Sequence, residues 1–141
     1  MTTIAYDGVT LATDSRVTSE GMVFGSACKI IKLDNGGLLA SAGDICLAYA
    51  VADWLNGNTD KPQVSDKPNY MGILLDPKAA AMEITQDMNV FPACVPWAGG
   101  SGEAYAMTAM LCGKSAIEAV KIACKLDIYS GLPVHHARHK K

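Results

Sequence analysis

The chain has 141 residues, of which 50% are hydrophobic and 18% are charged, and its formal net charge is -2. These values suit one globular domain spanning residues 1–141, and the absence of a basic excess gives no indication of a nucleic-acid partner. No apolar run reaches the roughly 18–20 residues that cross a membrane and no signal-peptide pattern opens the sequence, so we expect a cytosolic protein without membrane contacts.

The first 43 residues predict four strands arranged as two hairpins. Residues 3–12 read as two short strands around Asp7 and Gly8, a pair that is common in hairpin turns. Residues 28–33 and 38–42 form the second pair of strands, with a turn at residues 34–37. This density of short strands predicts a sheet-rich first half.

A helix is expected next, because apolar residues recur at helical spacing from Ile45 to Leu55. Asp44 is suited to cap its start, and Gly57 to end it. Residues 57–69 read as an exposed loop with two prolines. Strands are predicted over residues 70–75 and 80–85, followed by an edge segment over residues 89–95 that prolines interrupt.

Two further helices are expected over residues 103–111 and 115–126, the second starting with a capping box of Ser115 and Glu118. A short strand over residues 128–135 then precedes a basic tail. Strands, a helix, strands, two helices and a strand in this order predict an α+β fold. We expect the helices to cover both outer faces of two stacked sheets.

A phosphate-binding loop is suggested by Gly113-Lys114-Ser115 but does not fit. The motif needs a glycine five residues before Gly113, where Thr108 stands, and no strand leads into it. Capping of the following helix explains Ser115. The glycine-rich residues 99–103 likewise read as an ordinary helix-entry loop, although such a loop is able to hold an anion.

The histidines and cysteines indicate structural roles. His135, His136 and His139 lie in a basic run with no carboxylate or cysteine to complete a metal site, so we expect a solvated tail and no histidine-based triad. The five cysteines are widely spaced and include no C-x-x-C pair, which argues against a disulfide framework or a zinc site. We expect each to be a small buried side chain.

Four polar residues stand out by their surroundings. Thr2 follows Met1, Asp14 follows an apolar strand, Lys29 lies within another, and Asp127 lies between a helix and a strand. Each alone is compatible with an ordinary surface position. Ionised groups in apolar surroundings usually pair, because desolvating a lone charge is costly, so together they suggest a paired site.

Six segments resemble, in chain order, the proteasome β-subunits and the bacterial peptidase HslV. They are Thr-Thr-Ile-Ala at 2–5, Ala-Thr-Asp-Ser-Arg-Val-Thr at 12–18, Lys-Ile-Ile at 29–31, Ser-Ala-Gly at 41–43, Gly-Ser-Gly-Glu-Ala-Tyr-Ala at 100–106 and Asp-Ile-Tyr-Ser-Gly at 127–131. Any one match is weak, whereas six in order are specific. The resemblance implies an N-terminal nucleophile hydrolase with a four-layer α/β/β/α sandwich.

The sequence departs from that family after the segment at 41–43. The family has two long helices there, whereas here only residues 44–56 look helical and residues 57–69 form a loop with prolines. We therefore expect one outer helix to be missing. The family uses this layer for contacts between subunits, so the size of any ring is left open.

The resemblance implies a threonine endopeptidase that needs no metal or cofactor. Thr2 would be the nucleophile and its α-amine the general base, which requires removal of Met1 because an amide nitrogen is not basic. Lys29, held in place by Asp14, would lower the pKa of the hydroxyl, and the Gly43 N–H would stabilise the oxyanion. The amine and the attacking water would be oriented by Ser101, Asp127 and Ser130. An acyl-ester on Thr2 would form and then be hydrolysed.

The same pattern implies a roomy, apolar pocket for the residue before the scissile bond, which favours cleavage after large hydrophobic side chains. Its lining residues would be Val17, Thr18, Ala27, Ile31, Ser41 and Ile45. The expected substrate is an unfolded polypeptide bound as an added strand. The expected partners are other copies in a ring, with an ATPase unfoldase as a further candidate. Two other functions stay open, a catalytically silent assembly subunit and a small-molecule amidase.

Overall fold

The computed structural model describes residues 2–63 and 69–140 and has an α+β fold. One antiparallel sheet has the strand order β10 (Trp97–Gly100), β1 (Thr3–Tyr6), β2 (Thr10–Thr13) and β11 (His135–Arg138). The other has the order β5 (Ile30–Lys32), β6 (Leu38–Gly43), β7 (Tyr70–Leu75), β8 (Met82–Ile84) and β9 (Val90–Pro92). A separate hairpin pairs β3 (Arg16–Ser19) with β4 (Met22–Ser26). The helices are α1 (Ile45–Leu55), α2 (Glu103–Leu111) and α3 (Ala116–Leu126).

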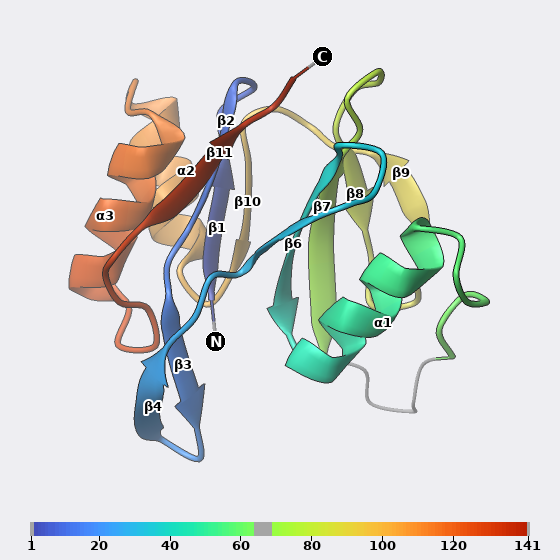
Figure 1. The fold of residues 1–141 in the computed structure, drawn as a ribbon. Coiled ribbons are helices and arrows are strands. Elements are labelled where there is room, and N and C mark those ends of the chain that lie inside the picture. The colour runs from blue at the N-terminus through green and yellow to red at the C-terminus, as the bar shows by residue number, and fades with distance from the viewer. Residues whose placement is uncertain (1, 64–68, 141) are drawn as a thin grey trace.

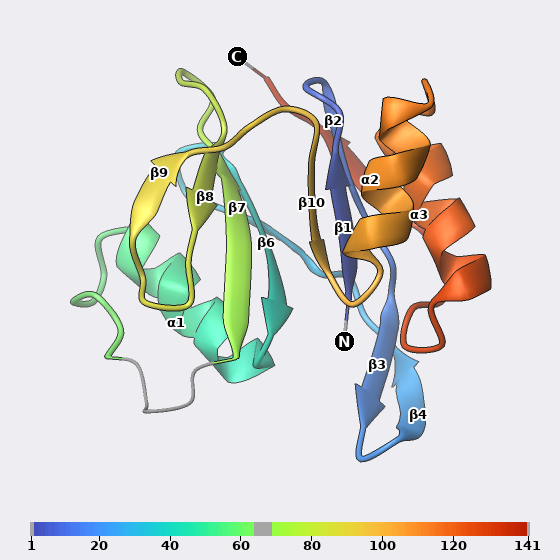
Figure 2. The ribbon, with the colours of Figure 1, turned by 180° about the vertical axis from the view of Figure 1, so that it is seen from behind.

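The two larger sheets face each other, and the helices lie on their outer sides (Figures 1 and 2). Alternation along β1 explains this arrangement, because Ile4 and Tyr6 point into the cluster between the sheets whereas Ala5 points toward α2 and α3. Alanines dominate the interface with these two helices, which lets them approach the sheet closely. On the other side, α1 packs through Val51 against Leu39 of β6.

The predicted hairpins and helices are present. The side chain of Asp7 accepts the N–H groups of the turn between β1 and β2. Asp44 caps α1 by accepting from the Cys46 N–H at 2.8 Å, and Ser115 caps α3 by accepting from the Glu118 N–H at 3.2 Å. None of the described helices combines the length and apolar character that a membrane span requires.

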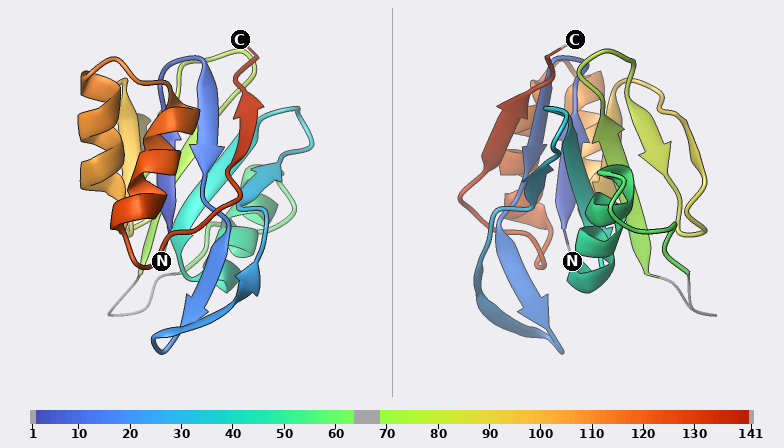
Figure 3. Two further views of the ribbon diagram at one scale, coloured as in Figure 1. Left: turned by 90° about the vertical axis from the view of Figure 1, so that its left-hand side faces the viewer. Right: turned by 45° about the vertical axis from the view of Figure 1, so that its right-hand side comes forward.

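One helix, α1, covers the outer face of the five-stranded sheet within the described residues (Figure 3). Residues 57–63 are not helical, in agreement with the predicted loop. The part of that loop at residues 64–68 lies outside the described residues.

Three predictions about strands are wrong. Residues 16–26 form the unforeseen hairpin β3–β4, which turns through Glu20 and Gly21 with positive φ. Strand β10 occupies what we expected to be a helix-entry loop, because β1 pairs with it from Thr3↔Gly100 onward. The last strand is β11 and does not lie at residues 128–135, where a loop leads into it.

The prediction of a solvated histidine tail is also wrong. His135 pairs with Thr13 in the sheet, and His139 is buried. The Nδ1 atom of His139 lies 2.7 Å from the Tyr6 hydroxyl, and its Nε2 atom lies 2.6 Å from the Asp76 carbonyl oxygen. Because Tyr6 belongs to one sheet and Asp76 follows a strand of the other, His139 links the two sheets.

The cysteines differ from expectation as well. Cys28, Cys46, Cys94 and Cys112 are exposed, and Cys124 is partly buried. Cys28 and Cys94 lie in segments between strands, and Cys112 lies just after α2, where apolar sequence neighbours do not imply burial.

Candidate active site

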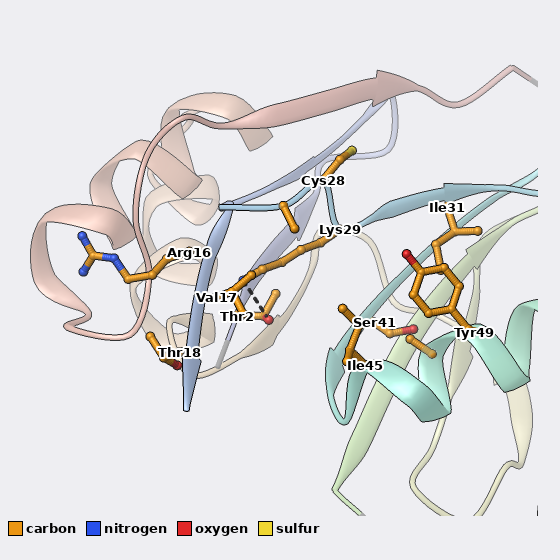
Figure 4. Close-up of a pocket in the computed structure, with 12 residues that line it drawn as sticks. Thr2, Arg16, Val17, Thr18, Cys28, Lys29, Ile31, Ser41, Ile45 and Tyr49 are labelled. Carbon is orange, nitrogen blue, oxygen red and sulfur yellow. Dashed lines mark hydrogen bonds between the residues drawn. The ribbon is translucent and has the colours of Figure 1, made fainter. Parts of the chain in front are cut away.

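Lys29 and Asp14 form an ion pair beside Thr2. The Lys29 Nζ atom lies 2.8 Å from Asp14 Oδ1 and donates to Thr2 Oγ1 at 3.1 Å (Figure 4). The side chain of Asp14 is fully buried, and that of Lys29 is 12% exposed. Burial lowers the pKa of Lys29 from its ordinary value, and the carboxylate of Asp14 opposes that shift. The pair therefore presents a desolvated ammonium group to the threonine hydroxyl.

Backbone N–H groups fix the carboxylate of Asp14. Its Oδ1 atom accepts from Thr3 N at 3.0 Å, while its Oδ2 atom accepts from Arg16 N at 3.1 Å and Gly131 N at 3.0 Å. With Lys29 this gives four donors for one buried carboxylate, which compensates the cost of removing it from water. Asp14 is thereby held in one orientation toward Lys29.

Asp127 lies at the centre of a second polar group. Its Oδ2 atom accepts from Ser101 Oγ and Ser130 Oγ, each at 2.6 Å. Burial raises the pKa of Asp127, but the two serine hydrogen bonds and the Tyr129 N–H outweigh this effect, so the net pKa lies below its ordinary value. The carboxylate is consequently ionised and occupied as an acceptor.

The second group reaches the start of the chain through hydroxyls. Ser130 lies 2.6 Å from Thr3 Oγ1, and because its own hydrogen is donated to Asp127, Thr3 must be the donor of that bond. Ser101 Oγ lies 3.4 Å from the carbonyl oxygen of Thr2. The two polar groups therefore approach Thr2 from two sides of the backbone.

Asp14, Ser15 and Arg16 hold the loop that carries Asp127. Ser15 donates from its backbone N to the Gly131 oxygen at 3.0 Å and from its hydroxyl to the Pro133 oxygen at 2.6 Å. Arg16 donates from Nη1 to the Ile128 oxygen at 3.0 Å. No role was predicted for Thr3, Ser15 or Arg16, because their partners lie more than 110 residues away and leave no local pattern.

Two glycines permit close backbone approaches around Thr2. Gly43 has φ 109°, and a Cβ atom there would lie 2.0 Å from the Asn69 carbonyl oxygen. Gly100 has φ 92°, and its Cβ would lie 1.8 Å from the Thr2 carbonyl oxygen. A side chain is incompatible with either position. Thr2, Gly43, Gly100 and Ser101 line one cavity of about 300 Å³.

A second cavity, of about 160 Å³, lies on the other side of Thr2. All six residues predicted to line a substrate pocket line this one: Val17, Thr18, Ala27, Ile31, Ser41 and Ile45. Figure 4 shows Thr2 and Lys29 on one side of it and Ser41, Ile45 and Tyr49 on the other. Thr2 thus borders both cavities.

Ser41 has a partner that the sequence analysis missed. Its Oγ atom lies 2.7 Å from the hydroxyl of Tyr70, which is 5% exposed. Burial raises the pKa of Tyr70 to about 12, so the phenol is neutral at physiological pH. Ser41 therefore lines the cavity of about 160 Å³, and its hydroxyl is held by Tyr70, which lines the neighbouring cavity of about 300 Å³.

The predicted catalytic residues converge in space. Lys29 donates hydrogen bonds to both Thr2 and Asp14, and a second network joins Ser101, Asp127 and Ser130. The seventh, Gly43, faces the same cavity as Thr2. Within the described residues, no group of three or more histidine, cysteine or acidic side chains is suited to hold a metal ion.

Neither a protein-family model nor a curated protein sequence matches the chain. Solved structures match it over nearly the whole length. Thiobacillus denitrificans BPH aligns with TM-score 0.75 and 21% identity over 97% of this chain and 96% of that chain. The same protein in complex with Epoxomicin aligns with TM-score 0.73 and 20% identity over 97% and 96% of the two chains.

Eukaryotic HslV from Trypanosoma brucei aligns with TM-score 0.68 and 20% identity over 98% of this chain and 99% of that chain. At such identities the similarity concerns the fold. The chain therefore has an HslV-like, proteasome β-subunit-like fold, which confirms the resemblance found in its sequence.

Proposed function

We propose that this protein is a threonine peptidase of the proteasome type in which Thr2 is the nucleophile. The observation that carries the proposal is the 3.1 Å contact from Lys29 Nζ to Thr2 Oγ1, made by a lysine that Asp14 holds at 2.8 Å. Structural neighbours that include an HslV and a protein in complex with Epoxomicin support the same reaction class. The surrounding helix, sheet, sheet and helix layers support the four-layer architecture of N-terminal nucleophile hydrolases.

The first step requires a free amine on Thr2. Met1 lies outside the described residues, and its removal converts an amide nitrogen into an α-amine with a reference pKa of roughly 7.7–8.0. That amine takes the hydroxyl proton, directly or through a water, while the Lys29 ammonium stabilises the negative charge that develops on Oγ1. No histidine is needed for this proton transfer.

Thr2 Oγ1 then attacks the carbonyl carbon of the scissile peptide bond. The Gly43 N–H donates to the resulting oxyanion, a contribution typically worth about 3–4 kcal/mol. The protonated amine gives its proton to the leaving nitrogen, and an acyl-ester remains on Thr2. Water, oriented by the group around Asp127, hydrolyses this ester and restores the hydroxyl.

The substrate we propose is an unfolded polypeptide that binds as an added strand. Its side chain before the scissile bond enters the cavity of about 160 Å³, whose walls include Val17, Ile31 and Ile45. We expect cleavage after large hydrophobic residues. A panel of matched peptides tests this, and a clear preference for acidic residues at that position would contradict it.

The hydroxyl pair of Ser41 and Tyr70 refines this expectation. Ser41→Ala should shift the ratio of kcat/KM for tyrosine over phenylalanine at that position toward phenylalanine by about 2–10-fold, the value of one neutral hydrogen bond. Tyr70→Phe keeps the ring and removes only the hydroxyl that bonds Ser41, so it should shift the ratio in the same direction. An unchanged ratio in both variants would show that the two hydroxyl groups do not influence the preference between tyrosine and phenylalanine.

We further propose that copies of the chain assemble into a ring in the cytosol, with an ATPase unfoldase as a possible partner. The hairpin β3–β4 projects from the body of the molecule (Figure 3), and Met22, Val23 and Phe24 are 60–68% exposed there. A second copy would cover such an apolar surface. Native mass spectrometry tests the proposal, and a monodisperse monomer at micromolar concentration would contradict it.

The decisive experiment follows activity and Met1 in one preparation. Peptidase activity is measured before and after treatment with a methionine aminopeptidase, while intact mass reports the fraction that begins at Thr2. Activity should rise with that fraction, and Epoxomicin should bind the processed protein but not its Thr2→Ala variant. Equal activity with Met1 fully retained would exclude the α-amine as the base.

A further inference from the structure

A third cavity lies on the side of the loop at residues 127–133 that faces α3. It has a volume of about 460 Å³. Its lining residues are Arg16, Lys121, Cys124, Lys125, Gly131 and Leu132. Three of these six side chains are cationic and none is a carboxylate, in a chain whose formal net charge is -2. The cavity is therefore a local concentration of positive charge, which we call the basic cavity.

The two lysines have no ionic partner among residues 2–63 and 69–140, where the ion pairs are Lys29–Asp14 and Lys114–Glu118. Lys121 and Lys125 are four residues apart on α3 and so lie on one face, where like charges repel. The helix dipole favours Lys125 in the last turn. Lys121 lies one turn earlier and has no such compensation, so an anion between the two lysines would relieve their repulsion.

Arg16 completes the charge from another element. Its side chain points away from Thr2 (Figure 4) and donates from Nη1 to the Ile128 oxygen. It also lies so close to Gly131 that a Cβ atom there would be 2.6 Å from Arg16 Nε. No other acceptor for its remaining guanidinium N–H groups occurs within the described part of the chain. The cations of the basic cavity thus come from two elements, strand β3 and helix α3, and not from the solvated face of a single helix.

Cys124 does not offset the positive charge. Burial raises the pKa of its thiol to about 11, so the group is neutral at physiological pH. Asp14 and Asp127, which lie behind the loop, are already occupied by their own donors, and Glu118 on α3 is paired with Lys114 at 4.0 Å. The lining of the basic cavity accordingly carries three formal positive charges and no carboxylate.

We infer that the basic cavity binds a phosphate-bearing anion, either a free inorganic phosphate or the diphosphate of a nucleotide. The planar guanidinium matches two oxygens of a phosphate group, and the two ammonium groups supply charge without strict geometry. A ligand there also touches Arg16 and Gly131, two residues that hold the loop carrying Asp127. Occupancy is therefore coupled to the position of that loop.

The test uses the full-length protein and pyrophosphate at constant ionic strength. Calorimetric titration should give saturable binding, and Lys121→Ala with Lys125→Ala should weaken it by about tenfold per lysine removed. Lys114→Ala, which removes a lysine just before α3, is the matched control and should leave binding unchanged. Restoring positive charge with arginine at both positions should restore the affinity. None of these three lysines belongs to the proposed peptidase site, so basal activity should not change.

Alkylation of Cys124 gives a local readout that does not depend on catalysis. Pyrophosphate should slow its modification, followed by peptide mass spectrometry, while Cys112 serves as an internal control. Tighter binding of ADP than of pyrophosphate would assign the site to a nucleotide, and the reverse to a free anion; either result supports it. No saturable binding, tighter binding of citrate than of either phosphate, or equal binding by the double variant would overturn the inference.

Discussion

The two ends of the space between the sheets contrast with each other. At one end, buried polar groups around Thr2 border two cavities. At the other, the Tyr6 hydroxyl, the His139 ring and the Asp76 carbonyl form a hydrogen-bonded chain, with the Tyr6 and His139 ring centroids 5.7 Å apart. Both ends use the same interactions to join distant segments. The polar groups at the first end line cavities, whereas those at the second end bond to one another and join the two sheets.

The largest effect we expect is at the first end. Thr2→Ala should reduce peptide hydrolysis to background, because no other residue combines a nucleophile with its own base. Thr2→Ser keeps the hydroxyl and should retain measurable activity. Thermal unfolding of both variants should stay close to that of the parent protein. Full activity of the alanine variant would show that Thr2 is not the nucleophile, and the functional difference between the two ends would then be lost.

Lys29→Ala and Asp14→Ala should each reduce kcat/KM by about two orders of magnitude or more, and the double variant should be little worse, because the pair acts as a unit. Stability should separate them. Asp14→Ala removes the carboxylate partner of Lys29 and the acceptor of three N–H groups, at a cost of about 3–5 kcal/mol, whereas Lys29→Ala leaves those N–H bonds in place. Rate measurements with urea unfolding test both points, and additive rate losses would mean that the residues act independently.

The opposite end should show the reverse behaviour. His139→Ala and Tyr6→Phe should each lower the free energy of unfolding by about 1–3 kcal/mol, because a buried partner is left unsatisfied. Their double variant should lose less than the sum of the two, by about 0.5 kcal/mol or more. Peptidase kcat/KM should be unchanged in all three. A rate loss in the folded variants would show that the two ends are coupled.

The smallest effect concerns the pH dependence of stability. The pKa of Asp127 is lower in the folded state than its ordinary 3.8, so its contribution is present above that value and is lost as the pH falls through the folded pKa. The Asp127→Asn variant lacks this contribution. The slope of its unfolding free energy against pH should therefore differ from that of the parent protein by at most about 1.4 kcal/mol per pH unit. Urea unfolding between pH 6 and pH 3 measures it. Identical slopes would mean that Asp127 is not preferentially ionised in the folded protein.

Local patterns were sufficient to predict β1, β2, the three helices and the N-terminal caps of α1 and α3. They missed β10, because two glycines in Trp97–Gly100 disfavour a strand and only the pairing with β1 produces one. They missed β4, because an apolar strand that stays exposed has no alternating pattern to reveal it. Burial of His139 depends on Tyr6 and Asp76, which lie 133 and 63 residues away.

The candidate site was more predictable than the fold around it. Because six segments resemble the family in the same chain order, Thr2, Asp14, Lys29 and Asp127 were predicted as site residues without any knowledge of their contacts. The same resemblance identified the pocket lining but not Tyr70, which reaches Ser41 from the neighbouring strand β7. The resemblance also did not reveal that Ser15 and Arg16 hold the loop that carries Asp127. Their hydrogen bonds reach residues more than 110 positions later, so neither segment shows a local pattern for them.

The hydrogen bond from Gly131 N to Asp14 spans 117 residues, and this separation has a consequence for biosynthesis. Translation proceeds from the N-terminus, so Thr2 and Asp14 leave the ribosome long before Gly131 is made. Until then Asp14 lacks one of its donors, the loop that bears Asp127 does not exist, and strand β2 has no β11 beside it. Under the proposed function, a nascent chain that already begins at Thr2 would therefore be inert. Polypeptides emerging around it on a polysome would be spared, because the last elements to be synthesised complete the proposed site.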